Sequence, residues 1–194
     1  MRFPKPVFEG DSESLEEILE ASRHEEEARR RRFLEFTLQD FFLNLRSRDK
    51  LSKARTRGAL PCRDDRELVE LAQRLMREAS DDYLRLRMQW QREAVGYLSS
   101  LAMEAHARLG GGEMLIPDGL DYVGMQAEGA PECPILLRAG RIGNFAGLKA
   151  KHLHIKAEEV GDYCLRRAFR CAVDAGRAGK CLGEEGEELR LKAR

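Results

Sequence analysis

The sequence has no net charge, no long apolar run and no apolar leader at its start. Lys and Arg number 34, as do Asp and Glu, so nothing global attracts the chain to nucleic acid or to an anionic membrane. No uncharged stretch approaches the roughly 20 residues that a membrane-spanning helix needs, and the opening MRFPKPVFEG lacks the apolar stretch of a signal peptide. We therefore expect a cytoplasmic protein that does not enter membranes.

Motifs of catalysis are also missing. No Ser-His-Asp or Cys-His arrangement can be argued, and the glycine run at 110–112 lacks the Lys-Ser/Thr of a phosphate-binding loop. The acidic pairs at 81–82 and 184–185 have no partner histidine or second carboxylate at a telling distance. We therefore assign no catalytic residue and no cofactor, and we lean towards a protein that is not an enzyme.

Five cysteines, an odd number in a chain without a secretion signal, are expected to be reduced thiols rather than a disulfide framework. Cys62 and Cys133 fall in predicted loops, where a reactive or metal-binding thiol is one interpretation and an isolated exposed thiol the commoner one.

The most informative feature that is present is an 18-residue repeat. Gly143, Gly161 and Gly179 stand 18 residues apart, and the three segments that they open align position by position: GNFAGLKAKHLHIKAEEV, GDYCLRRAFRCAVDAGRA and GKCLGEEGEELRLKAR. A fixed period of this size is typical of a solenoid. Each leading glycine marks a position that needs either a positive φ or a close approach between coils.

The columns of this alignment predict which side chains face inward, because stacked coils keep the same column buried. The third column holds apolar or small residues throughout (Phe145, Tyr163, Cys181), and we expect it to face inward. The second half of each segment alternates apolar and polar residues, the pattern of a strand with one face buried. Its inward residues are Leu153, Ile155 and Ala157, then Cys171, Val173 and Ala175, then Leu189, Leu191 and Ala193.

An earlier coil precedes the three glycine-led segments. Residues 120–128 and 134–142 align with the same columns if residues 129–133 are a five-residue insertion at a coil corner. A short strand at 113–116 leads into this coil. We therefore predict about four 18-residue coils of parallel strands.

Several strings resemble a known family. DYVGMQAEG at 121–129, GRIGNFAG at 140–147 and GDYCLRRAFRCAVDAGRAG at 161–179 look like the glycine-patterned (GXGXG) right-handed β-helix that closes the large subunit of glutamate synthase. A similar repeat forms one of the subunits of formylmethanofuran dehydrogenase. The resemblance covers about residues 112–194. The residues that carry it are Gly143, Gly161, Gly179, Asp121, Tyr122, Gly124 and Tyr163.

The resemblance implies a right-handed parallel β-helix that packs catalytic parts together and holds no catalytic residue of its own. The chain departs from the family in mid-coil, where the family often has a glycine pair. The residues at these places are Lys151-His152, Phe169-Arg170 and Glu187-Glu188.

The first half of the chain has helical patterns. Ser14 and Glu17 form a capping box that opens one helix, straight or kinked, from about 13 to 48. A basic connection follows, and Asp64 or Asp65 caps a second long helix, within which residues 80–82 are a further candidate start. The glycine run at 110–112 ends it.

These patterns predict an α+β protein in two parts. Residues 1–110 form a long-helix hairpin or bundle, and residues 111–194 form the short β-helix. A short solenoid exposes an unpaired face at each end, so we expect the helices or a partner chain to cover one end.

Two clusters could bind a ligand. His152 and His154 suggest a metal pair, but the columns place them outward and Cys164, Cys171 and Cys181 inward, so we predict no metal site. A basic loop between the helices is the better candidate for contact with nucleic acid. Its residues are Arg46, Arg48, Lys50, Lys53, Arg55 and Arg57.

Three functions remain as hypotheses. The first is a non-catalytic scaffold or assembly protein that uses a helical docking arm and a rigid β-helix surface, with a protein partner or with itself. The second is a subunit or stand-alone relative of an amidotransferase or redox enzyme complex. The third is nucleic-acid binding through the basic loop.

Overall fold

The computed structural model describes residues 12–45, 50–82, 86 and 88–193, with side-chain environments from residue 17 onward. The chain divides into two compact units, residues 1–36 and residues 37–194. Helices lie in the first half and a parallel β-solenoid in the second, which confirms the predicted two-part α+β layout. The last helix ends at Arg108 and the first strand begins at Met114.

The first unit contains helix α1, Ser12–Glu35. The predicted single helix from 13 to 48 is wrong, because α1 ends at Glu35 and a separate helix α2 runs over Leu38–Leu45. Thr37 explains the break: its hydroxyl accepts from the amide of Asp40 (3.2 Å), and the Asp40 carboxylate accepts from the amide of Thr37 (2.9 Å). This reciprocal pair is a capping box, which begins a new helix.

Three more helices follow in the second unit. A short helix α3, Lys53–Gly58, lies within the predicted connection, and Ser52 caps it. Helix α4 spans Asp65–Asp81 with Asp64 as its cap, as predicted, and α5 spans Gln89–Arg108. The second long helix is therefore two helices, with the break after Asp81, close to the candidate start at 80–82.

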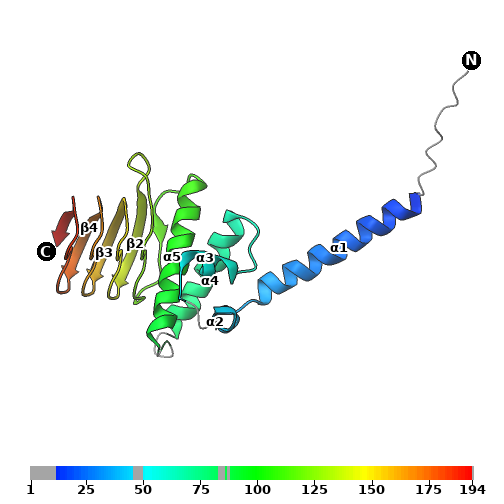
Figure 1. Cartoon of the computed structure of the whole chain (residues 1–194), viewed down its shortest axis with the longest axis horizontal. Helices are drawn as coiled ribbons and strands as arrows, with labels where there is room; N and C mark the ends of the chain where they lie inside the picture. Colours follow the sequence, from blue (N-terminus) through cyan, green and yellow to red (C-terminus); the bar gives the residue numbers. More distant parts are fainter. Residues whose placement is uncertain (1–11, 46–49, 83–85, 87, 194) are drawn as a thin grey trace, which may run out of the picture. The chain divides into compact units, whose positions relative to one another are not determined.

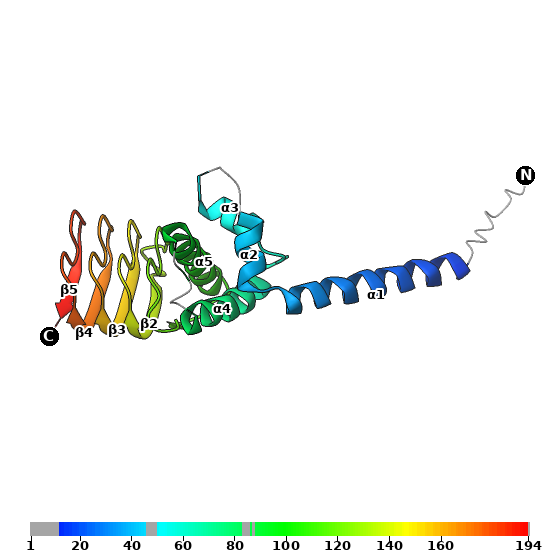
Figure 2. The same cartoon turned by 90° about the horizontal axis from the view of Figure 1, so that it is seen from below.

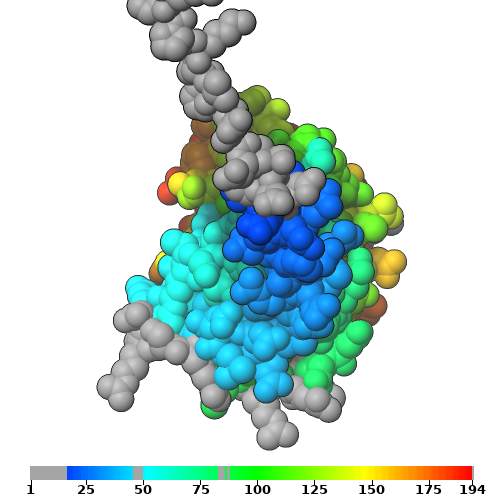
Figure 3. Space-filling view, turned by 90° about the vertical axis from the view of Figure 1, so that its right-hand side faces the viewer, coloured from blue at the N-terminus to red at the C-terminus, as the bar shows by residue number. Residues whose placement is uncertain are grey.

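Helices α4 and α5 pack against each other through apolar seams (Figure 1). Fully buried side chains make this core: Leu68, Leu71, Leu75 and Ala79 from α4, and Ala94, Leu98, Ala102 and Ala105 from α5. Figure 3 shows the helical face of the molecule in space-filling form.

The solenoid is a five-stranded parallel sheet in which each strand pairs with the next along the chain (Figure 2). The strands are β1 Met114–Leu115, β2 Ile135–Ile142, β3 Leu153–Val160, β4 Ala172–Ala178 and β5 Arg190–Ala193. Ile135 pairs with Leu153 and Ala172 with Arg190, a step of 18 residues. Met114 pairs with Leu137, a step of 23, as the predicted insertion at 129–133 requires.

Three steps of 18 residues connect β2 to β5, so the regular repeat makes about three turns, slightly fewer than the four 18-residue coils predicted. Counting also the longer segment that contains the insertion, we call residues 120–142, 143–160, 161–178 and 179–193 the first to fourth coils. The predicted inward columns are buried in the second and third coils, where Leu153, Ile155, Cys171 and Val173 are at most 2% exposed. In the fourth coil Leu191 is 45% exposed.

The third column does not face inward, which corrects the prediction. The rings of Tyr122, Phe145 and Tyr163 stack in a ladder with centroids 5.0 and 5.1 Å apart, and Phe145 and Tyr163 stay partly exposed. Cys181, the fourth member, is exposed. All four residues have φ between 56° and 59°, so they occupy a left-handed corner of the coil.

The leading glycines serve close approach and not a positive φ. A Cβ at Gly161 would lie 2.7 Å from the carbonyl carbon of Gly143, and one at Gly179 would lie 2.7 Å from that of Gly161. Left-handed residues in mid-coil include His152, Arg170 and Glu188.

A ladder of short polar side chains joins the coils next to the glycines. Asp121 accepts from the amide of Asn144 (2.7 Å), and Asn144 accepts from the amide of Asp162 (2.8 Å). Asp162 then accepts from the amide of Lys180 (2.7 Å). The Asp of the Gly-Asp-Tyr string therefore holds the next coil in place.

Candidate functional site

The structure places two of the four described residues of the predicted basic loop in internal contacts. Lys53 forms an ion pair with Glu104 (2.9 Å) and donates to the carbonyl of Gln126 (2.8 Å). Arg55 donates to the carbonyl of Leu45 (2.5 Å), Lys50 is exposed and Arg57 is half-buried. Arg46 and Arg48 lie outside the described residues. The described part of this loop therefore uses two of its cations to hold the fold.

The histidines and cysteines do not converge. No group of three or more His, Cys, Asp or Glu side chains among the described residues could hold a metal ion. Burial raises the pKa of the Cys164 thiol to about 12 and that of Cys62 to about 11. Cys62 is half-buried rather than an exposed loop thiol, and Cys133 is exposed.

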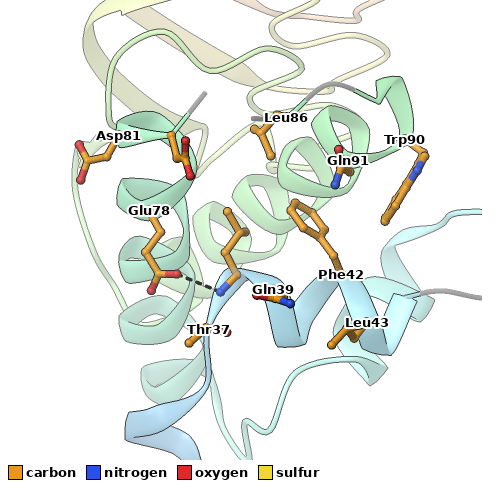
Figure 4. Close-up of a pocket in the computed structure, with 11 residues that line it drawn as sticks. Thr37, Gln39, Phe42, Leu43, Glu78, Asp81, Leu86, Trp90 and Gln91 are labelled. Carbon is orange, nitrogen blue, oxygen red and sulfur yellow. Dashed lines mark hydrogen bonds between the residues drawn. The ribbon is translucent and has the colours of Figure 1, made fainter. Parts of the chain in front are cut away.

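A hollow of about 670 Å³ lies between α2, α4 and α5 (Figure 4). Phe42 and Trp90 lie on one side of it with ring centroids 5.5 Å apart, and carboxylates lie on the other. The polar groups there have structural partners: Glu78 accepts from the amide of Leu38 (2.9 Å), and Gln91 accepts from the amide of Met88 (3.2 Å). These contacts make the hollow a helix junction without paired catalytic groups.

The two ends of the solenoid differ, and this difference is the most informative functional geometry. Helix α5 covers the end formed by the first coil. The contact is close at Gly96, where a Cβ would lie 2.7 Å from the carbonyl oxygen of Tyr122. Only a residue without a side chain lets the helix approach this coil.

Side chains of α5 replace the hydrogen bonds of a preceding coil. The hydroxyl of Ser99 accepts from the amide of Gly124 (2.9 Å), and that of Ser100 donates to the carbonyl of Met125 (2.7 Å). The carboxylate of Glu104 accepts from the amide of Glu128 (2.8 Å). Each of these three backbone groups has an equivalent in the later coils that bonds to the coil before it.

The later coils show this equivalence directly. The amide of Gly147 bonds to the carbonyl of Val123, and the amide of Lys151 bonds to that of Ala127, at 2.7 and 2.8 Å. The carbonyl of Leu148 accepts from the amide of Gln126 at 2.8 Å. Helix α5 therefore supplies partners for three of the backbone groups that would otherwise bond to a preceding coil.

The fourth coil has no such cap within the described chain. In the coils before it, three amides and two carbonyls of each turn segment bond to the coil that follows. The equivalent groups here are the amides of Cys181, Glu185 and Glu188 and the carbonyls of Leu182 and Gly186. No further coil follows them among residues 12–193. We call this surface, with Leu182, Leu189 and Leu191, the open end.

Ion pairs hold the fourth coil to the third. Arg166 pairs with Glu184 (3.0 Å), Arg170 with Glu188 (2.6 Å) and Lys192 with Asp174 (3.3 Å). Hydrogen bonds from Arg167 and Arg166 lower the pKa of Glu185, and those from Arg170 lower the pKa of Glu188. The fourth coil is thus anchored along its rim while its end face stays open.

The capping residues of α5 were not predicted from the sequence. Gly96, Ser99, Ser100 and Glu104 form a small and polar stripe at helical spacing, and this stripe was the available signal. Serine in a helix interior is common enough on solvated faces that the stripe by itself does not indicate a cap. The hollow between α2, α4 and α5 was not predicted either.

We compared the chain with family models, with curated proteins and with solved structures, and none of the three comparisons found a match. The fold defines the class, a parallel β-solenoid whose first coil is capped by a helix. Among the described helices, none is both long and apolar enough to cross a membrane.

Proposed function

We propose that the protein is a non-catalytic assembly module that docks through the open end of its solenoid. The observation that carries this proposal is the difference between the two ends. At the first coil, three side chains of α5 satisfy the backbone groups, whereas the equivalent groups of the fourth coil have no partner in the described chain. Unpaired backbone groups at a sheet edge are a template for binding another chain.

The side chains of the open end support docking in the same way. Proteins protect an exposed edge with short strands, with charged side chains or with charges that point inward, and β5 is short and carries Arg190 and Lys192. Here the inward column of the fourth coil is apolar, with Leu189, Leu191 and Ala193 in register with buried residues of the third coil. A partner would cover this apolar column as the fourth coil covers Val173.

Helix α1 supports a second docking element, the helical arm. It forms a unit by itself, and Ile18, Leu19 and Leu34 are 63%, 57% and 55% exposed. Exposed apolar side chains near both ends of an otherwise charged helix are compatible with binding to another helix or to a groove.

Site-specific photocrosslinking tests the docking surface. A photoreactive amino acid at position 191 should form a crosslink to a protein in cells that make this chain. The matched control is position 115, an exposed leucine (67%) on β1 of the same sheet, away from the open end. Crosslinks at 115 equal to those at 191, or none at 191, would exclude docking through the open end. A flavin or iron–sulfur enzyme captured at 191 would favour the enzyme-subunit hypothesis.

A further inference from the structure

We propose that the hollow between α2, α4 and α5 is a binding site for an organic cation, a protonated amine with a short apolar body. The apolar body lies against the aromatic side of the hollow, and the ammonium group lies against its carboxylate side. This inference goes beyond the assembly function and does not depend on the end of the solenoid. Three properties of the hollow carry it: its size, its two-sided chemistry and its charge.

The size of the hollow suits a small molecule. Its volume of about 670 Å³ lies within the range of roughly 300–1,000 Å³ that small-molecule sites occupy. The described residues that line it all lie between Thr37 and Gln91, within the second unit. The shape of the hollow therefore does not depend on where α1 lies.

One side of the hollow is aromatic. The half-buried rings of Phe42 and Trp90 meet edge to face, with centroids 5.5 Å apart and an interplanar angle of 79°. Phe42 also contacts the fully buried ring of Phe41 (5.6 Å), which supports it from the core. Aromatic rings of this kind attract both apolar groups and organic cations.

The other side of the hollow is acidic (Figure 4). Glu78 accepts from the amide of Leu38 through Oε2 (2.9 Å), and its Oε1 has no hydrogen bond to the described chain. Asp81 is exposed and forms no hydrogen bond or ion pair with a described residue. The hollow is also lined by Asp82, and no Lys, Arg or His is among its described lining residues. It therefore attracts cations.

The position of these carboxylates in α4 strengthens the attraction. Glu78 and Asp81 lie in the last turn of the helix, which has no basic residue, and Asp82 is its C-cap. The C-terminal end of a helix carries a partial negative charge, which favours cations and disfavours further carboxylates. A bound cation would relieve this repulsion.

The two sides together select the class of ligand. An anion would be repelled, and a neutral apolar molecule would leave the carboxylates without a partner. Among the described residues, no three His, Cys, Asp or Glu side chains lie close enough together to hold a metal ion. An amine with an apolar body is the ligand that contacts both sides.

Fluorescence of Trp90 reports on the site directly, because it is the single tryptophan of the sequence. We would titrate the purified full chain with hexylamine and with 1-hexanol, a neutral molecule with the same apolar body. We expect a saturable change with hexylamine and binding of hexanol that is weaker by roughly fivefold, the upper range for an exposed ion pair. Equal binding of the two, or no saturable change with hexylamine, would overturn the proposal.

Two substitutions test the carboxylates. Asp81→Asn and Glu78→Gln remove a charge and keep the shape, and a glutamine oxygen can still accept from the amide of Leu38. Each should weaken hexylamine binding by up to roughly fivefold and leave hexanol binding unchanged. Glu132→Gln, at an exposed carboxylate of the insertion at 129–133, is the matched control and should have no effect. Thermal unfolding checks that the variants remain folded. Hexylamine binding that both variants retain in full would show that the carboxylates do not hold the amine.

The source of the amine needs a second probe, because a lysine side chain of a partner has the same chemistry as a free amine. Nα-acetyl-lysine amide, which has the lysine side chain between blocked ends, is that probe. Weaker binding of this probe than of hexylamine identifies a free amine as the ligand, and equal binding identifies a lysine side chain. Either result supports the cation site. None of these outcomes affects the crosslink at position 191, so the site and the docking function are tested independently.

Discussion

At the scale of single residues, the small side chains that cap the first coil contribute to the stability of the fold. Ser99 and Ser100 are fully buried, and their hydroxyls contact backbone groups of both α5 and the first coil. Removing such a partner leaves a buried donor or acceptor without a hydrogen bond, which costs more than the bond contributes when it is formed.

Ser99→Ala should therefore lower the free energy of unfolding by about 1–3 kcal/mol, because the amide of Gly124 loses its acceptor. Denaturant titration measures this change. Ser22→Ala, at an exposed serine of α1, is the matched control and should change the stability by less than about 0.5 kcal/mol. Equal effects of the two substitutions would show that Ser99 does not cap the solenoid.

Thiol reactivity tests the residue environments separately. At pH 8, a thiol whose pKa is about 11, such as Cys62, is thiolate in roughly one molecule per thousand. Burial raises the pKa of Cys164 to about 12, and its side chain is also shielded. We expect an alkylating reagent to label the exposed Cys133 rapidly and Cys62 and Cys164 slowly, as read by mass spectrometry of peptides. Fast labelling of Cys164 would contradict its inward position in the third coil.

At the scale of the elements, the coils are held together by several ladders. The Asx ladder at Asp121, Asn144 and Asp162 and the aromatic ladder at Tyr122, Phe145 and Tyr163 run through the first three coils. Between the third and fourth coils, ion pairs involving Glu184, Glu185, Glu188 and Lys192 reinforce these contacts. The fourth coil therefore depends on charge to a greater degree than the third.

Acidification should loosen the fourth coil before the others. The folded-state pKa values of Glu185 and Glu188 lie below the ordinary 4.5 because arginines donate to both carboxylates. Their stabilisation is therefore complete above about pH 4.5 and is lost as the pH falls through the lowered values. Hydrogen exchange of the Glu187 amide, corrected for the intrinsic rate, measures this opening against the Lys151 amide of the second coil.

The control for this prediction is Arg170→Gln, which removes the cation beside Glu188 and should weaken the pH dependence of the exchange. If the amides of Glu187 and Lys151 gain exchange in parallel as the pH falls, the ion pairs do not govern the fourth coil.

The 18-residue periodicity predicted the strands of the solenoid well. It predicted less well which side chains are buried. The 18-residue step, the insertion at 129–133 and the buried strand columns followed from repeated apolar positions, because every stacked coil obeys the same constraint. The residue types in one column of the repeat do not show whether the side chains face inward or stack on each other at the surface. The column of Phe145 was therefore predicted to face inward. The prediction that Cys181 faces inward was wrong for a second reason: no described coil follows the fourth coil and buries it.

The helical half was harder to predict because its breaks depend on single side chains. The apolar pattern continues through Phe33, Phe36 and Phe41, whereas the capping pair Thr37 and Asp40 ends one helix and begins the next. The cap formed by Ser99 and Glu104 depends on a coil that is distant in sequence. Local patterns could indicate that some cap was needed, but not which residues form it.

At the scale of the whole molecule, the two ends of the solenoid differ: α5 caps the first coil, and no described residue covers the fourth (Figures 1 and 2). The uncovered face of the fourth coil is the docking surface that we propose. A rigid solenoid that binds a partner at one end is sufficient for the assembly role that we propose.

Photocrosslinking at position 191, compared with position 115, tests the central claim most directly, because both leucines are exposed on the same sheet and only one lies at the open end. We predict a protein crosslink at 191 in cells and little or none at 115. A position 191 that stays uncrosslinked in cells would contradict assembly through the open end.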